Sequence, residues 1–570
     1  MTEPTPRVTL DWQVPPRDFF FAPGVDDGLW TVGPLPQMWD KRPKGRIAAA
    51  SVSEFARFET PIESHIETHF RRRSFRSGLV FQTVPVVLEG LRTEGHYLAV
   101  HDRYLLTGAA GTRLRNRYHW YNEGLRDADT ETAEYFARLQ AKDPVPPVWD
   151  GPTDGLDFVI DARNAFNFYH FSTETLGQLC LVDHDGFTGQ VYIHCDRHDV
   201  KDFIRDWVDQ MFPRLLGRVH FRSGRHRYDR CLSTLNARHL WYQSGPTVMD
   251  GIDAEAPDTH YWKGRDPDRM SLAVLAMNSC DGLLLRLRKT ALHLIEGGEW
   301  DHLPRRFWVG RKSNRVRPMW GEDDLTDALE NRGFKVIYFE DYSPLEQVAL
   351  MARAEVMMSY HGAGFANMMF AGPDTHCIEI GTLQTCLYRW QDFMPHTIVS
   401  GCRYTSLFAD FNVTDPAEGP EIRSRPLNAV RLGPVGQARV LDYVDAILGD
   451  VRIDDAGWLA RVASCLGRTD DRVALERLLD GHPRAAMADP DLMILRANLY
   501  LADDDEAPAR LLLERAWEAT GDRPFLLERL ILLCDRAGAD APWAALHRDL
   551  YPKRASLLNR KLRRQRRRRG

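Results

Sequence analysis

The stretch Tyr360–Asn367 reads Tyr-His-Gly-Ala-Gly-Phe-Ala-Asn, and it joins a short apolar run at residues 355–359 to a second apolar run that begins near Phe365. The pattern predicts a buried strand, a tight glycine-containing loop and the first turn of a helix. Such an arrangement gathers backbone N–H groups around one point, where they can bind an anion. Glu379 ends the next apolar run, and its carboxylate could bind ribose hydroxyls. The stretch therefore predicts a site for a nucleotide diphosphate.

The segment before this stretch alternates between strand and helix patterns. The predicted elements are strands at 307–309, 335–339 and 355–359 and helices that begin at Glu322 and at the capping box Ser343-Pro344-Leu345-Glu346. Short connections between such elements predict a parallel, doubly wound sheet, in which ligands bind beyond the carboxyl ends of the strands. Arg311 and His361 each follow a predicted strand, so both should face one crevice.

Composition excludes several classes of protein. The chain has 570 residues with 44% apolar residues and 15 Trp, which predicts several packed domains. Its nine Cys are scattered without a Cys-x-x-Cys pair, which argues against a disulfide scaffold and a zinc ribbon. No apolar run is long enough to span a membrane, and the N-terminus lacks a signal-peptide core, so a cytoplasmic protein is expected.

Charge is distributed unevenly along the chain. Residues 553–570 carry ten basic side chains and no acid, and because the whole chain carries −6, removing those ten positive charges leaves −16. An acidic body does not fit a nucleic-acid-binding enzyme. The tail is expected to be disordered and exposed, where it could attach the protein to an anionic surface at the inner face of a membrane.

The order of short motifs resembles glycosyltransferase family 61, which includes plant xylan transferases, eukaryotic O-linked N-acetylglucosaminyltransferases and bacterial capsule-type proteins. The motifs are Arg311-Lys312, Gly333-Phe334, Glu340-Asp341, the loop 361–367 with Glu379, and upstream Asn167-Phe168-Tyr169-His170 with Glu174. The resemblance implies a GT-B-like pair of Rossmann-like domains, an inverting mechanism and a nucleotide-sugar donor, most often UDP-linked. No cofactor is expected to be required beyond the nucleotide-sugar donor, which is a substrate.

Sugar transfer requires groups that stabilise a departing diphosphate and a base that deprotonates the acceptor. The expected donor-binding residues are Arg311, Lys312, His361, Gly362, Ala363, Gly364, Asn367 and Glu379. Each has a plainer alternative: the glycines could only form a turn, Arg311 could pair with a surface acid, and Asn367 could close the first helical turn.

His170 and Glu174 are spaced i, i+4, so on a helix they share one face. A His–carboxylate pair can act as base and orienter, which makes these two the catalytic candidates. The alternative is a buried histidine bonded between helices. Asp183-His184-Asp185 has the Asp-x-Asp form of metal-dependent transferases, but Asp is also an ordinary turn residue, and no metal site is predicted.

The C-terminal third contains a repeat, because Pro490 and Pro524, like Leu492 and Leu526, are 34 residues apart. This period is typical of tetratricopeptide helix pairs. The predicted domains are an N-terminal extension (1–75), an acceptor-side α/β domain (76–265), a nucleotide-sugar-binding Rossmann-like domain (266–450), tetratricopeptide-like helical repeats (451–552) and a basic disordered tail (553–570).

The resulting expectation is an inverting glycosyltransferase that moves a sugar from a nucleotide-sugar donor to a glycan or lipid-linked glycan in surface polysaccharide biosynthesis. A protein partner could bind the helical repeats. Two alternatives stay open: an inactive transferase-fold scaffold that binds partners through its repeats, and an epimerase-like enzyme that acts on the donor without an acceptor.

Overall fold

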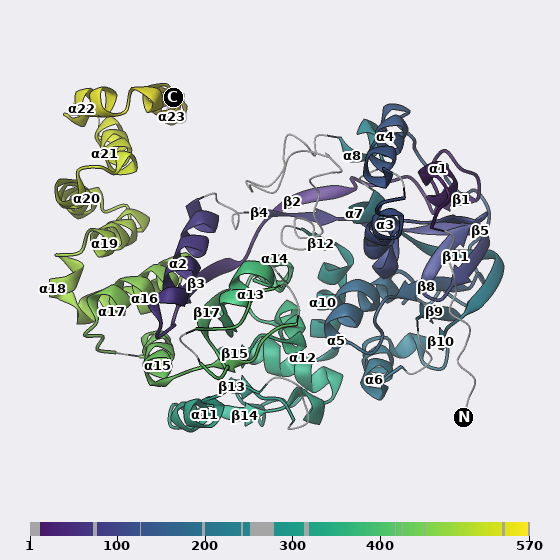
Figure 1. The fold of residues 1–570 in the computed structure, drawn as a ribbon, viewed down its shortest axis with the longest axis horizontal. Coiled ribbons are helices and arrows are strands. Elements are labelled where there is room, and N and C mark those ends of the chain that lie inside the picture. Colours follow the sequence, from purple (N-terminus) through teal and green to yellow (C-terminus); the bar gives the residue numbers. More distant parts are fainter. Residues whose placement is uncertain are drawn as a thin grey trace. The chain divides into compact units, whose positions relative to one another are not determined.

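The computed structural model describes residues 12–71, 77–125, 127–196, 200–240, 243–250, 279–312, 318–390, 392–415, 418–423, 426–449, 451–537 and 542–567. The chain divides into two compact units (Figure 1). The first comprises Met1–Ile47 and Phe55–Arg431, and the second comprises Ala48–Glu54 and Leu432–Gly570. Strand β3 (Arg46–Ser51) spans the point where the chain first passes between them.

The first half of unit 1 is built on an eight-stranded mixed sheet of order β10-β9-β8-β11-β5-β6-β7, with β1 beside β5. Its strands are β1 (Leu29–Thr31), β5 (Thr83–Glu94), β6 (Tyr97–Val100), β7 (Arg103–Tyr104), β8 (Phe158–Ala162), β9 (Val191–Cys195), β10 (Val219–Arg222) and β11 (Arg225–Asn236). Strands β8, β9 and β10 run parallel, whereas β11 and β5 pair antiparallel along nearly their whole length. This long antiparallel pair departs from the expected Rossmann-like pattern, so the pairing of two Rossmann-like domains stays a prediction.

The helices of this half pack around that sheet and its neighbour. They are α1 (Pro16–Phe19), α3 (Gly108–Asn122), α4 (Ala128–Ala141), α5 (Phe168–His170), the π-helical η1 (Phe171–Thr175), the 3-10 helices η2 (Leu176–Leu181) and η3 (Pro213–Leu215), α6 (Asp202–Met211), α7 (Ala237–Leu240) and α8 (Pro246–Met249). Helix α2 (Ala56–Arg71) lies instead against the second half of unit 1, where the Phe58 ring is 5.3 Å from the Phe411 ring. A small sheet joins β2 (Trp39–Pro43), β4 (Ser77–Phe81) and β12 (Ser279–Asp281).

The second half of unit 1 has the predicted strand–helix alternation. Its sheet has the order β14-β13-β15-β16-β17-β18, formed by β13 (Arg306–Val309), β14 (Lys335–Ile337), β15 (Val356–Tyr360), β16 (His376–Thr382), β17 (Arg403–Phe411) and β18 (Val430–Arg431). All neighbours are parallel except β18, which runs antiparallel to β17. The intervening helices are α10 (Leu283–Leu294), α11 (Glu322–Glu330), α12 (Pro344–Arg353), α13 (Leu383–Tyr388) and α14 (Met394–Ser400).

Local signals set these elements. The capping box at α12 is formed as predicted, since the Ser343 hydroxyl accepts from the Glu346 amide at 3.3 Å and the Ser343 amide donates to the Glu346 carboxylate at 2.7 Å. The predicted strand 335–339 is shorter, because Phe339–Asp341 turn into the 3-10 helix η5. The helix expected near Phe365 is the 3-10 helix η6 (Ala363–Phe370), in which every residue from Phe365 onward is buried.

Both halves of unit 1 pack on η6 and α12. The Trp207 indole of α6 stacks on Phe370 of η6, with ring centroids 5.7 Å apart and planes inclined by 16°. From α10, Arg288 donates to the Met369 carbonyl at 2.7 Å. Gln210 of α6 accepts from the Leu345 amide at 3.3 Å. Helices of both halves therefore hold the segment that carries the predicted anion loop.

Unit 2 is helical outside its short N-terminal segment. Its helices are α15 (Pro434–Leu448), α16 (Ala456–Arg468), α17 (Arg472–Gly481), α18 (Pro483–Ala486), α19 (Pro490–Ala502), α20 (Glu506–Thr520), α21 (Pro524–Arg536), α22 (Trp543–Leu550), the 3-10 helix η7 (Pro552–Arg554) and α23 (Ala555–Arg567). Helices α19 and α21 each begin with the proline of the 34-residue period. The tetratricopeptide-like assignment stays a prediction. Among the described residues, no helix combines the length and apolar character needed to cross a bilayer.

The basic tail differs from the expected disordered segment. Residues 555–567 form α23, and basic side chains of this region pair with acids on α21, which include Glu528 and Asp535. Disorder was expected because the tail's positive charges repel one another, and these ion pairs offset that repulsion. Arg568–Gly570 lie outside the described residues.

Candidate functional site

Arg311 lies against the glycine loop at the carboxyl edge of the second sheet. It follows β13 by two residues, and His361 directly follows β15. The Arg311 guanidinium carbon is 4.1 Å from the centroid of the Tyr360 ring, and Nη2 donates to the His361 carbonyl. A Cβ added at Gly362 would overlap Nη2 and would lie 3.0 Å from Cζ. The prediction that Arg311 and His361 meet at one edge is confirmed.

The loop backbone presents the start of η6 beside this guanidinium. Gly362, with φ −179° and ψ 174°, is the extended residue before the helix. Gly362, Ala363 and Gly364 are half-buried, in contrast to the fully buried residues that follow. The first N–H groups of a helix have no partner within that helix. These donors and the adjacent guanidinium make the loop suited to a diphosphate.

Two other predicted donor residues lie differently. Lys312 is exposed and forms an ion pair with Asp341 of η5. Asn367 is fully buried, and its amide donates to the Gln347 side chain at 3.1 Å. Gln347 in turn donates to the Phe339 and Tyr342 carbonyls, at 2.9 and 3.0 Å. Asn367 therefore fixes η6 to α12 from the inside, which differs from the expected alternative that it closes the first helical turn.

His361 and Glu379 form a buried pair. His361 Nδ1 lies 2.5 Å from Glu379 Oε1, while Tyr404 and Ser406 of β17 donate hydroxyl protons to Oε2. The Glu379 side chain is only 1% exposed, and burying a carboxylate is costly unless it is bonded in this way. A carboxylate can accept about four hydrogen bonds, so ribose binding at Glu379 stays a prediction. The carboxylate also orients His361, whose Nε2 lies 4.0 Å from Asp392 Oδ2.

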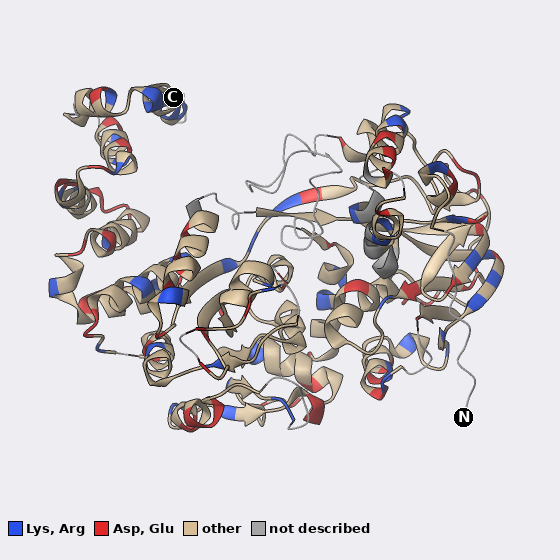
Figure 2. Ribbon diagram, in the orientation of Figure 1, with Lys and Arg blue, Asp and Glu red and all other residues tan. Residues whose placement is uncertain are grey.

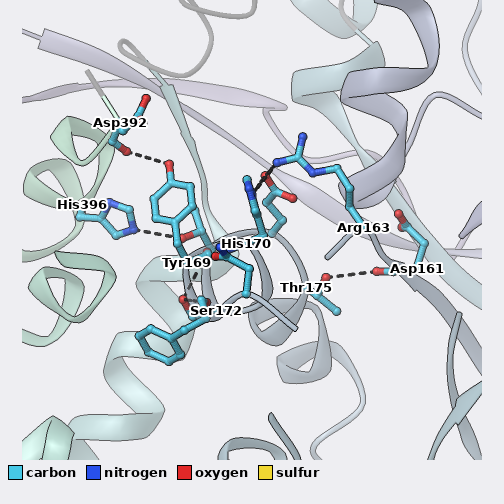
Figure 3. A network of polar contacts seen from close by, with 12 residues as sticks. Asp161, Arg163, Tyr169, His170, Ser172, Thr175, Asp392 and His396 are labelled. Carbon is cyan, nitrogen blue, oxygen red and sulfur yellow. Dashed lines mark hydrogen bonds and ion pairs between the residues drawn. The ribbon is translucent and has the colours of Figure 1, made fainter. Parts of the chain in front are cut away.

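A second cluster forms at the end of β8 (Figure 3). Arg163 directly follows the strand, and its Nη2 lies 2.5 Å from both His170 Nδ1 and Glu174 Oε1. His170 Nδ1 is 3.0 Å from the same carboxylate oxygen, which confirms that His170 and Glu174 share one face. Burial acts to raise the pKa of Glu174, but Arg163 and His170 outweigh it and hold that pKa below its ordinary value.

The protonation of His170 decides what this cluster can do. A guanidinium can only donate, so Nδ1 cannot both accept from Arg163 and donate to Glu174 when the ring is neutral. With the Nδ1 proton directed at Glu174, Nε2 is free to accept a proton, and the pair is a base with its orienter. With Nδ1 accepting from Arg163, Nε2 carries the proton and can only donate.

Tyr169 and Asp392 join the two clusters, and Figure 3 shows the bond between them. The Tyr169 hydroxyl donates to the Asp392 carbonyl at 2.7 Å, and the Tyr169 ring lies 5.3 Å from the His170 ring. The Asp392 carboxylate is 3.7 Å from Arg389 Nη1 and is 26% exposed. Burial raises the pKa of Asp392, whereas His361 and Arg389 act to lower it. One connected site therefore contains residues from both halves of unit 1.

A partly buried bond next to the site also connects the two halves. Thr173 of η1 lies 3.1 Å from Nε2 of His396 on α14. Burial lowers the pKa of His396 to about 4, so the ring is neutral at pH 7.

Sequence reasoning missed Arg163 and Asp392. Arg163 had a usable signal, because it follows β8 as closely as the anion-loop residues follow their strands. Asp392 had none, since it lies between α13 and α14, away from any strand end.

The Asp-x-Asp segment pairs with an arginine. Arg214 lies 3.1 Å from the Asp185 carboxylate and 4.0 Å from that of Asp183. Across the part of the chain that the structure describes, no three His, Cys, Asp or Glu side chains are arranged to hold a metal ion.

Comparison with known families supports the earlier resemblance. Residues 168–378 match the family model described as Glycosyltransferase 61. This span includes His170, Glu174, Arg311 and the glycine loop, and it ends one residue before Glu379. The match confirms the resemblance to this family and indicates glycosyltransferase activity. No curated protein matches the chain.

Proposed function

We propose that this chain is an inverting glycosyltransferase that takes a sugar from a nucleoside-diphosphate donor, with UDP as the first nucleotide to test. The acceptor would be a glycan or lipid-linked glycan in surface polysaccharide assembly. The observation that carries the proposal is the Arg311 guanidinium, which lies against the Gly362 backbone at the carboxyl edge of a parallel sheet. A cation beside helix N–H groups at this edge suits a diphosphate better than any neutral ligand.

In the proposed reaction, the acceptor hydroxyl oxygen attacks the anomeric carbon of the donor. The bond from that carbon to the diphosphate oxygen breaks, and the nucleoside diphosphate leaves with the bonding electrons. Arg311 and the N–H groups of Ala363 and Gly364 would stabilise the charge that develops on the leaving oxygen. The acceptor proton passes to a base on the opposite side of the sugar, as inversion requires.

His170 is the proposed base, with Glu174 as its orienter. The pair is about one-fifth exposed, so an acceptor can reach it, and Tyr169 links it to the loop half of the site. The low pKa of Glu174 keeps this carboxylate ionised at neutral pH, which favours a proton on Nδ1 and a free Nε2.

Donor binding is tested by calorimetric titration of UDP and other nucleoside diphosphates into the whole protein. Arg311→Ala should weaken binding by about ten- to a hundredfold, the loss of a charge-assisted bond. Arg305→Ala is a matched control, because Arg305 is exposed and precedes the same strand at its other end. If no nucleoside diphosphate bound the wild-type protein, the inactive-scaffold alternative would be favoured.

The base is tested with His170→Ala and Glu174→Gln, measured as sugar transfer at saturating donor. Both should reduce transfer by at least about a hundredfold while donor affinity is retained. His293→Ala is the control, because His293 and Glu296 form a similar pair at 3.0 Å that is largely exposed. Transfer that continues at wild-type rate in both variants would remove the pair from the mechanism.

A further inference from the structure

Helix α23 is docked on α21 by one of its faces. Lys561 donates to the Glu528 carboxylate at 2.7 Å, and Gln565 donates to the Leu532 carbonyl at 2.9 Å. Leu558, on the same side, is buried. These positions are spaced i, i+3 and i+7, so they form one stripe along the helix. The contacts with α21 fix the rotation of α23 about its axis.

The acid that anchors this helix is itself buried. The Glu528 side chain is 2% exposed, and it also accepts from Arg554 Nε at 2.7 Å. Burial acts to raise the pKa of Glu528, but the bonds from Arg554 and Lys561 outweigh it and lower that pKa. A second acid, Asp535, accepts from Arg566 at 2.6 Å. Part of the tail's positive charge is therefore used inside the unit.

The remaining arginines lie on the opposite side of α23. Arg560, Arg563, Arg564 and Arg567 are all exposed, and they too are spaced i, i+3, i+4 and i+7. This second stripe is displaced by two residues, or about 200°, from the docked stripe. Figure 2 shows the concentration of basic residues on this helix. We call these four residues the outer arginine face.

Apolar side chains accompany this face. Leu557 is 38% exposed and precedes Arg560 and Arg564 by three and seven residues, so it lies at the edge of the same side. On the preceding helix, Leu546 and Leu550 are 39% and 50% exposed. Surface helices that bind membranes combine a basic side with leucines that enter the headgroup region.

We propose that the outer arginine face attaches the protein to an anionic lipid bilayer. A flat, negatively charged surface can contact all four guanidinium groups at once, because they lie along one line of a helix whose rotation is fixed. Arginine pairs with phosphate groups through two parallel hydrogen bonds. The inference does not depend on the proposed transfer reaction, since none of these residues belongs to that site.

A bilayer fits this face better than a nucleic acid. Proteins that bind single strands interleave basic residues with aromatic rings that stack on bases. The outer arginine face contains no aromatic residue, and the exposed apolar residue at its edge on the same helix is a leucine, Leu557. Leucine gains from burial at the headgroup boundary but offers no stacking surface for a base.

The test is co-sedimentation of the whole protein with phosphatidylcholine vesicles that contain or lack phosphatidylglycerol. The wild-type protein should bind only the anionic vesicles, and less at higher salt. Each basic residue near an anionic surface contributes roughly a fivefold factor in partitioning. Changing all four outer arginines to Gln should therefore lower binding by at least about a hundredfold.

A matched variant distinguishes the effect of the outer arginine face on vesicle binding from the effect of net charge. Arg225, Arg227, Arg484 and Arg515 are exposed arginines elsewhere, and changing these four to Gln removes the same charge. This variant should bind anionic vesicles like the wild-type protein. Equal binding by both quadruple variants, or wild-type binding to RNA but not to anionic vesicles, would overturn the proposal. Thermal melting of both variants checks that a loss of vesicle binding does not result from general unfolding.

Discussion

Replacing Gly362 with Ala tests the geometry of the proposed diphosphate site through a single methyl group. The added Cβ would overlap Nη2 of Arg311 and approach Cζ to 3.0 Å, so the guanidinium must move. Because Gly362 has φ −179°, alanine adopts its backbone conformation without strain. The substitution should therefore displace Arg311 from the His361 carbonyl while the fold is retained.

The expected loss follows from the bond that the displaced guanidinium can no longer make. A hydrogen bond to a charged group contributes about 1.5–3 kcal/mol, which corresponds to about a ten- to hundredfold weaker affinity for UDP. Calorimetric titration measures this loss, and thermal melting checks stability. Gly449→Ala is the control, because an added Cβ there has no atom within 4 Å and its backbone is also extended.

A double-mutant cycle shows whether the methyl group acts through Arg311. If it does, Gly362→Ala should cost affinity in the wild-type background and almost nothing in the Arg311→Ala background. Full additivity of the two losses would mean that the methyl group blocks the ligand directly. Wild-type affinity in the single variant would refute the placement of the diphosphate beside Gly362.

Three further substitutions test electrostatic features of the structure. Burial lowers the pKa of His396 from 6.5 to about 4, so the unfolded chain binds the proton before the folded chain does. The free energy of unfolding should therefore fall by about 3 kcal/mol as pH drops from 6.5 to 4. Denaturant titration should show that His396→Asn removes this loss. The lowered pKa of Glu174 acts in the same direction, because here too the unfolded chain binds the proton first. Its stabilisation is complete above the ordinary pKa of 4.5 and is lost as pH falls through the lower folded value, so the stability difference between the wild-type protein and Glu174→Gln should shrink only at acid pH. Glu528→Gln should release α23, seen as faster amide hydrogen exchange over that helix, whereas Glu514→Gln, which alters a more exposed pair, should leave α23 protected.

The second half of unit 1 could be predicted because its signals are local. The capping box at Ser343, the glycine after α11 and the apolar runs of β13, β15 and β16 each act within a few residues. The carboxyl-edge rule then brought Arg311 and His361 together, although 50 residues separate them. Because the strands are parallel, residues that follow different strands in the sequence can be predicted to lie at the same edge of the sheet.

The hydrogen bond that connects the two clusters could not be predicted in the same way. Tyr169 and Asp392 are 223 residues apart, and the bond between them depends on how two halves pack. The helical tail was missed for a related reason. Its charges predict repulsion when α23 is considered alone, and the acids that stabilise it, Glu528 and Asp535, lie on α21.

The two His–carboxylate pairs of the site differ in what their carboxylates can still bind. Both oxygens of Glu379 have donors, and its burial fixes the ring of His361 in one orientation. By contrast, Oε2 of Glu174 has no hydrogen-bond partner among the described residues, and its side chain is 21% exposed. A fully bonded pair suits a rigid wall beside the leaving group, whereas a pair with an unused acceptor can rearrange as a proton arrives. This difference is the reason that we propose His170 as the base and His361 as a donor contact.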